Sequence, residues 1–104
     1  MDLVEHIYRV TGTWPKEEMF SLTNQIRRAT VSIPANIAEG QGRNTAKEFV
    51  YFLGIANGSL REVETYLMLG FRLQYCDETT FEELMHQATE VGNPLRGLIR
   101  KLRQ

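Results

Sequence analysis

Apolar residues recur along the chain at intervals of three and four positions, which is the spacing of one face of an α-helix. The clearest series lies between residues 45 and 74 and consists of Phe49, Leu53, Ala56, Leu60, Val63, Leu67 and Gly70. Nowhere does the chain alternate apolar and polar residues in the manner of a β-strand. The pattern therefore predicts an all-α protein, with this series facing the core.

The residues between the periodic segments predict where the first two helices begin and end. A first helix is expected over residues 2–11. Trp14-Pro15 opens the second, because proline is tolerated at the first helical position. This second helix is expected to run to about residue 38, with a break near Phe20-Ser21. Its core side is expected to hold Leu22, Ile26, Ala29, Ile33 and Ile37. Gly40 and Gly42 are expected to end it in the left-handed conformation that glycine readily adopts.

The third helix is expected to start after Asn44 or Thr45 as its cap and to run to about Gln74, and Thr45 and Glu48 have the spacing of a capping box. Asp77 or Thr79 is expected to cap the fourth, which runs to about residue 102 with a kink at Gly92-Asn93-Pro94. The loops are short, so neighbouring helices are expected to be antiparallel. The prediction is one domain over residues 1–104, an antiparallel up-down four-helix bundle with a short first helix.

The third helix carries more apolar surface than one core requires. A second series lies on another side of it: Tyr51, Ile55, Tyr66, Leu69 and Leu73. The two series together span an arc of about 200°, whereas a helix that faces a single core needs little more than about 100°. A chain of this length has few other elements to cover the excess. The sequence therefore predicts self-association into a homo-oligomer through this second series.

The second helix combines small apolar residues with a row of polar ones. Val31, Pro34 and Ala38 lie on one side of it, and between this side and the core side run four polar residues that we call the polar seam: Arg28, Ser32, Asn36 and Glu39. Spacings of four residues allow hydrogen bonds along the seam from Arg28 to Ser32 and from Ser32 to Asn36. We expect the seam to line the oligomer interface.

Charge is unevenly distributed in a chain whose formal net charge is only −1. Residues 77–90 contain five acidic residues and no lysine or arginine, and residues 95–104 contain four basic residues. Acids at a helix start and bases at its end also complement the helix dipole, so the gradient has a purely structural explanation. The alternative is RNA or DNA binding through basic patches, with Arg27, Arg43, Lys47, Arg96, Arg100, Lys101 and Arg103 as the contacts.

Residues with the spacing of catalytic or metal sites are absent. Cys76 is the only cysteine, and His6 and His86 belong to none of the common helical metal motifs. We expect no cofactor, no metal and no catalytic residues. An enzyme that uses Glu39 as a base is the less favoured alternative. No segment is long and apolar enough to span a membrane, and no signal peptide is recognisable, which favours a cytoplasmic protein without a membrane partner.

Several motifs have the order and spacing of a known family. They are Pro15-Lys16-Glu17-Glu18, Leu22-Thr23-x-Gln25-x-Arg27-Arg28-Ala29, Ser32-Ile33-Pro34-Ala35-Asn36-Ile37-Ala38-Glu39-Gly40 and Phe52-Leu53-x-Ile55-Ala56-x-Gly58-Ser59-Leu60. In these segments the chain resembles the four-helix-bundle proteins encoded in 23S rRNA intervening sequences, also called S23-type proteins. The resemblance implies a ring-like homopentamer with no established enzymatic activity.

A related group implies a second possibility. The accessory variability determinants of diversity-generating retroelements use a similar pentameric barrel to bind nucleic acid and a reverse transcriptase. Those relatives are strongly basic, whereas this chain has a net charge of −1. Family members also commonly carry a longer N-terminal segment with a Leu-x-Val-Trp motif. The start is therefore expected to be truncated, or neighbouring subunits to cover the gap.

Overall fold

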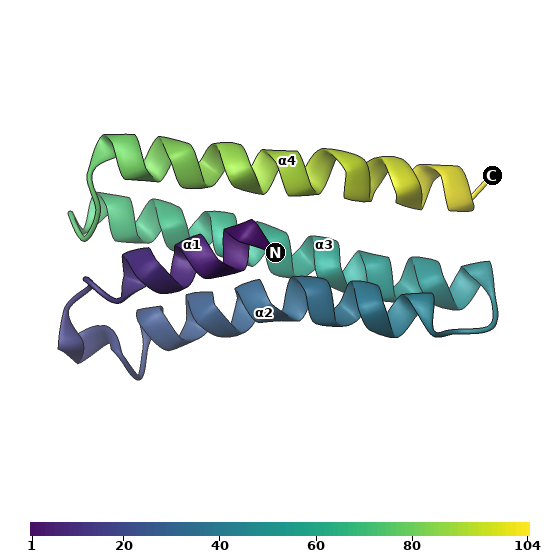
Figure 1. Cartoon of the computed structure of the whole chain (residues 1–104), viewed down its shortest axis with the longest axis horizontal. Coiled ribbons are helices and arrows are strands. Elements are labelled where there is room, and N and C mark those ends of the chain that lie inside the picture. The colour runs from purple at the N-terminus through teal and green to yellow at the C-terminus, as the bar shows by residue number, and fades with distance from the viewer.

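The computed structural model describes all 104 residues and contains four α-helices and no strand. The helices are α1 (Asp2–Thr11), α2 (Leu22–Gln41), α3 (Ala46–Arg72) and α4 (Glu78–Leu102), with a one-turn 3₁₀ helix, η1 (Lys16–Glu18), between α1 and α2. Successive α-helices run in opposite directions along a body of 43 × 24 × 18 Å (Figure 1). The predicted all-α class and the number of helices are confirmed.

The helices are arranged as a square. α2 packs against α1 and α3, and α4 packs against α3 and α1, whereas α2 and α4, like α1 and α3, lie on the diagonals with no Cα atoms within 8 Å of each other. α1 has only 10 residues, about 15 Å of helix, against 27 residues in α3. Figure 1 shows α1 beside only one half of the bundle, so the other half is built from α2, α3 and α4.

The predicted core series of α3 faces inward. Leu53, Ala56, Leu60, Val63 and Leu67 are completely buried, Gly70 is buried, and Phe49 is half-buried at the edge. They pack with buried residues of the other helices, including Ile7 of α1, Ile26 and Ile33 of α2, and Leu84 of α4. Burial of such aliphatic side chains, at about 25 cal/mol per Å² of apolar surface, is the main force that holds the four helices together.

Side chains cap two helices at their starts. The Thr45 hydroxyl accepts a hydrogen bond from the Glu48 amide at 3.1 Å and donates one to the Glu48 carboxylate, also at 3.1 Å. At α4 the Asp77 carboxylate accepts from the Thr80 amide at 2.8 Å, and this bond holds the pKa of Asp77 below its usual value. Asp77 is therefore the cap of α4, and Thr79 lies inside the helix.

The glycines at the end of α2 do not adopt the predicted left-handed conformation. Gly40 lies within α2 and is buried against α3: a Cβ there would stand 2.8 Å from Cδ1 of Phe49. Gly42, with φ −82°, is right-handed. The prediction was wrong because Gly40 serves close packing between helices, and a local glycine pattern does not distinguish that role from a turn.

The left-handed residue of this chain is Gln74, with φ 65°, just beyond α3. The Tyr75 amide donates to the Gly70 carbonyl at 2.8 Å, and the Gln74 amide donates to the Phe71 carbonyl at 2.9 Å. These two bonds define a Schellman motif, which satisfies the last carbonyls of α3 and turns the chain toward α4.

The break predicted near Phe20-Ser21 is confirmed, because α2 begins at Leu22 and η1 precedes it. Both internal prolines, Pro34 and Pro94, are accommodated within α-helices, and α4 continues through the segment 92–94 to Leu102.

The end of the bundle at η1 is closed by aromatic residues. Trp14 is buried and lies 5.7 Å from the Tyr75 ring, measured between ring centroids. The Tyr75 hydroxyl donates to the Glu18 carboxylate at 2.7 Å, and the Ser21 hydroxyl donates to the same carboxylate. The hydrogen bonds from Ser21 and Tyr75 hold the pKa of Glu18 below its usual value. The connection before α2 is thereby tied to the connection between α3 and α4.

Tyr75→Phe is expected to raise the pKa of Glu18 toward its usual value, because one of the two hydroxyls that favour the carboxylate is lost. A depressed pKa stabilises the folded state above the unfolded-state pKa, and this contribution is lost as the pH falls through the folded-state pKa. The variant should therefore lose stability at neutral pH and depend less on pH in the acidic range. An NMR titration of the Glu18 carboxyl carbon measures the shift directly, and an unchanged pKa would contradict the assignment.

Candidate interaction surfaces

The second apolar series of α3 lies on the outer face of the helix. Tyr51 is 65% exposed, Ile55 37%, Leu69 43% and Leu73 52%, whereas Tyr66 is half-buried and packs against the core. Four of the five residues that were predicted to need a cover are thus open to solvent in the single chain. Exposed apolar residues aligned along one helix are typical of an association surface.

Two glycines lie on the same outer face, one helical turn apart. A Cβ at Gly54 or at Gly58 would have no neighbour within 4 Å. Glycine in a helix interior costs about 1 kcal/mol relative to alanine, and no contact within this chain requires either residue to be so small. Glycines at such positions allow a second backbone to approach closely.

The polar seam divides into two parts. Asn36 donates its side-chain amide to both the carbonyl and the hydroxyl of Ser32, each at 2.8 Å, as the spacing predicted. The Ser32 hydroxyl pairs at 2.9 Å with that of Ser59 on α3, which is only 5% exposed. This part of the seam joins α2 to α3 within one chain, a role that the pattern on α2 alone does not reveal.

Arg28 and Glu39, the two charged residues of the seam, face outward. The expected bond from Arg28 to Ser32 does not form. Arg28 instead lines a hollow of about 430 Å³ between α2 and α3, together with Gln25, Ala29, Ser32, Ser59 and Glu62. Glu39 is exposed and forms an ion pair with Arg43 at 2.5 Å. A base for catalysis would need to be enclosed with a substrate, and this carboxylate is open to water on the bundle surface.

Of the remaining titratable groups, His6, Cys76 and Asp77 line one hollow of about 360 Å³. The His6 ring nitrogen Nδ1 lies 2.6 Å from the side-chain oxygen of Gln87, which links α1 to α4, and His86 lies near Glu90 on the surface. Burial, with a smaller effect from the Asp77 charge, raises the pKa of the Cys76 thiol. No three His, Cys, Asp or Glu side chains come together in a geometry that could hold a metal ion.

Five of the predicted nucleic-acid contacts gather at one end of the bundle. The α2–α3 connection and the C-terminus lie at the same end, opposite η1 (Figure 1). This end carries five exposed basic residues: Arg43, Lys47, Arg100, Lys101 and Arg103. All but Arg43 have no acidic partner within ion-pair distance. We call this group the basic end.

The other two predicted contacts have partners within the chain. The Arg27 guanidinium donates to the Thr11 hydroxyl at 2.9 Å and to the Tyr8 carbonyl at 3.2 Å, and it lies over the Tyr8 ring. Arg27 therefore provides a hydrogen-bond donor to a carbonyl group in the C-terminal turn of α1. Arg96 donates to Asn93 and to Asn57 on α3.

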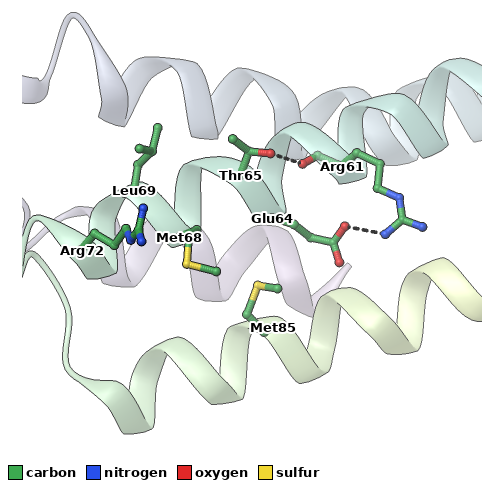
Figure 2. A pocket seen from close by; sticks show the side chains of 7 residues that line it. All are labelled: Arg61, Glu64, Thr65, Met68, Leu69, Arg72 and Met85. Atoms are coloured by element: carbon green, nitrogen blue, oxygen red, sulfur yellow. Dashed lines mark hydrogen bonds and ion pairs between the residues drawn. The ribbon is translucent and has the colours of Figure 1, made fainter.

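A groove between α3 and α4 was not foreseen from the sequence (Figure 2). It is open to solvent, with a volume of about 460 Å³, and Met68 of α3 and Met85 of α4 point toward each other across it. The remaining lining residues are Arg61, Glu64, Thr65, Leu69 and Arg72. Arg61 pairs with Glu64 at 3.0 Å, whereas Arg72 has no acidic partner. Met68 lies outside both apolar series of α3, so periodicity did not single it out.

No helix of the structure is sufficiently long and apolar to cross a membrane. The structure is thus a small antiparallel helical bundle with an uncovered apolar face on α3 and a basic end. The chain belongs to the family of 23S rRNA-intervening sequence proteins, whose family model matches residues 1–97.

A solved structure supports this membership. The chain is similar to a protein of unknown function from the S23 ribosomal protein family of Bacteroides thetaiotaomicron, with a TM-score of 0.81 and 27% sequence identity. The similarity covers 93% of this chain and 94% of the other. No curated protein matches the chain.

Proposed function

We propose that this protein is a non-enzymatic, cytoplasmic scaffold or interaction module that assembles into a homo-oligomer through the outer face of α3. The observation that carries the proposal is the alignment of exposed Tyr51, Ile55, Leu69 and Leu73 with the two open glycines, Gly54 and Gly58. A single chain leaves this surface in water. A symmetric assembly of identical chains would cover it in every copy, and five is the number that the S23-type resemblance implies.

The outer hollow at Arg28 supports the same assembly. It lies between α2 and α3 and is lined mainly by polar residues, with Arg28 and Glu62 as its charged groups. Neither forms an ion pair within the chain. A neighbouring subunit can supply partners for both, which would set the register of the contact, since polar groups that are buried without partners cost about 1–3 kcal/mol each.

Ile55→Asp is expected to reduce the mass of the assembly to that of one chain, because it places a charge in the middle of the proposed contact. Light scattering after size exclusion measures the mass. Leu98→Asp is the matched control, since Leu98 on α4 is also 37% exposed and receives the same substitution. Circular dichroism should show that both variants stay helical. A wild-type chain with the mass of a monomer would overturn the proposal.

The basic end favours a second candidate function, which is RNA or DNA binding. Arg43 and Lys47 lie beside the exposed ring of Tyr51 around a hollow of about 400 Å³ that Glu48 and Phe52 complete. Exposed aromatic rings next to basic side chains are what proteins use to hold single-stranded nucleic acid, by stacking and by phosphate contacts. This candidate requires that Tyr51 stays uncovered. An oligomer that leaves it open would repeat the five basic residues in every subunit, which would compensate for the low net charge of one chain.

The affinity of a short structured RNA is expected to fall with salt by a logarithmic slope of about −0.7 to −0.9 per phosphate contact. Lys101→Glu should weaken binding at low salt and reduce the slope by about 1 or more, because it removes a contact and adds a repulsive charge. Lys16→Glu at the opposite end reverses the same charge and should leave both unchanged. Fluorescence anisotropy measures the affinity. No binding at low salt, or equal effects of the two variants, would exclude this candidate.

A further inference from the structure

Phe20 is the most exposed large apolar residue of the chain, at 93%. It stands in the turn between η1 and α2, and hydrogen bonds within the chain hold this turn. Backbone bonds run from Met19 to Lys16 and from Ser21 to Glu18, and the Glu18 carboxylate holds the hydroxyls of Ser21 and Tyr75. Phe20 is thus an exposed aromatic side chain on a hydrogen-bonded turn, and aromatic side chains of this kind often act as anchor residues at protein interfaces.

The groove between α3 and α4 has the size and lining to receive such a ring. Its volume of about 460 Å³ exceeds that of a phenylalanine side chain, and the facing side chains of Met68 and Met85 offer flexible, polarisable contacts to an aromatic ring. Charge is complementary as well. Glu17 is exposed three residues before Phe20, and Arg72 on the rim of the groove has no acidic partner in its own chain.

Phe20 does not fill the groove of its own chain. The turn that carries it leads into α2, and α2 occupies the corner of the square diagonal to α4, with no Cα atoms of the two helices within 8 Å of each other. Phe20 is also fully open to solvent, so it touches little of its own chain. The groove includes Leu69, one of the residues on the outer face of α3. An occupant of the groove would therefore extend the contact already proposed for that face.

We propose that Phe20 of one copy inserts into the α3–α4 groove of the next copy, with Glu17 facing Arg72. This inference rests on the proposed homo-oligomer and specifies its geometry. Because the inserted residue and the groove are different surfaces of the chain, the contact is head-to-tail. Each copy has one Phe20 and one groove, so in a closed, ring-shaped assembly every Phe20 is inserted and every groove is filled.

The experiment combines two variants that damage opposite sides of the same contact. Phe20→Asp removes the inserted ring and keeps the groove, whereas Met68→Asp damages the groove and keeps the ring. Both positions are exposed, so both variants should stay helical by circular dichroism. Each alone is expected to have the mass of one chain at a concentration where the wild type is fully assembled. A mixture in equal amounts should contain particles of two chains, joined by the one intact contact.

Met19→Asp is the control, because it adds the same charge one residue away from Phe20 at another exposed position, and it should keep the wild-type mass. Glu17→Arg should weaken the assembly at low salt, and Glu17→Arg with Arg72→Glu should restore it, because like charges at a contact repel and the double exchange pairs them again. Failure of the double variant to assemble better than Glu17→Arg would contradict the Glu17–Arg72 contact.

The inference and the proposed function can fail separately. If Phe20→Asp keeps the wild-type mass while Ile55→Asp loses it, the insertion is wrong and the scaffold stands. If the mixture of Phe20→Asp and Met68→Asp remains at the mass of one chain, the head-to-tail contact is wrong. A wild type with the mass of one chain at every concentration overturns both.

Discussion

Gly70→Val is expected to destabilise the folded chain by about 3 kcal/mol, the upper part of the range for overpacked cores. A Cβ at this position would lie 2.6 Å from Cη2 and 2.7 Å from Cζ2 of the Trp14 ring. The ring cannot move away easily, because it is only 5% exposed and packs against Tyr75. The space at position 70 has no room for a Cβ, and valine adds two methyl groups beyond it.

Urea unfolding followed by fluorescence measures this effect, since Trp14 is the only tryptophan and reports on the same contact. Gly97→Val is the control: it also lies inside a helix, and the nearest atom to a Cβ there is Nη2 of Arg100 at 3.9 Å, an ordinary contact. Its free energy of unfolding should stay the same or rise by a few tenths of a kcal/mol, because valine has a higher helix propensity than glycine. Equal losses in the two variants would mean that the Trp14 contact is not the cause. Protein concentration must be kept constant, because assembly contributes to apparent stability.

Leu67→Ala and Leu69→Ala are expected to separate the two faces of α3. Leu67 is completely buried, so its truncation leaves a cavity and should cost about 2–5 kcal/mol of unfolding free energy. Leu69 is 43% exposed on the outer face, and the same truncation should change the stability of the single chain by only about 0.5 kcal/mol. It should instead weaken the assembly, because it removes apolar surface from the proposed contact.

Unfolding curves and light scattering on both variants provide the comparison. The expected pattern is loss of stability for Leu67→Ala and loss of mass for Leu69→Ala. If Leu69→Ala also destabilises a chain that has been made monomeric by Ile55→Asp, then the outer face contributes to the fold itself. The interpretation of that face as an association surface would then be wrong.

Local patterns predicted the elements of this fold well. The cap at Thr45, the break before Leu22 and the inward series of α3 were all read from residues a few positions apart, and the structure confirms them. Gly40 and Gly42 show the limit of such patterns. The sequence does not show why a glycine stands at these positions. At Gly40 the reason is that Phe49 and Phe52 of α3 leave no space for a Cβ.

The candidate surfaces were predicted only in part. The outer series of α3 followed from periodicity along a single helix, and four of its five residues are exposed. The sequence did not predict that five of the seven basic residues form the basic end and that the other two, Arg27 and Arg96, are bound to partners within the chain. Arg27 and Arg96 have structural partners 16 and 39 positions away in the chain, and no local pattern carries that information.

The sequence by itself determined the helices, the cap at Thr45 and which face of α3 is buried, because these depend on side chains within one or two helical turns. The tertiary structure decided which basic residues lie together at one end of the bundle. It also decided that Ser32 is hydrogen-bonded to Ser59 and that Met68, Met85 and Arg72 line one groove. The physical reason is the antiparallel packing of the four helices. It brings residues from distant parts of the chain side by side, and their contacts depend on the register between helices rather than on spacing within any one of them.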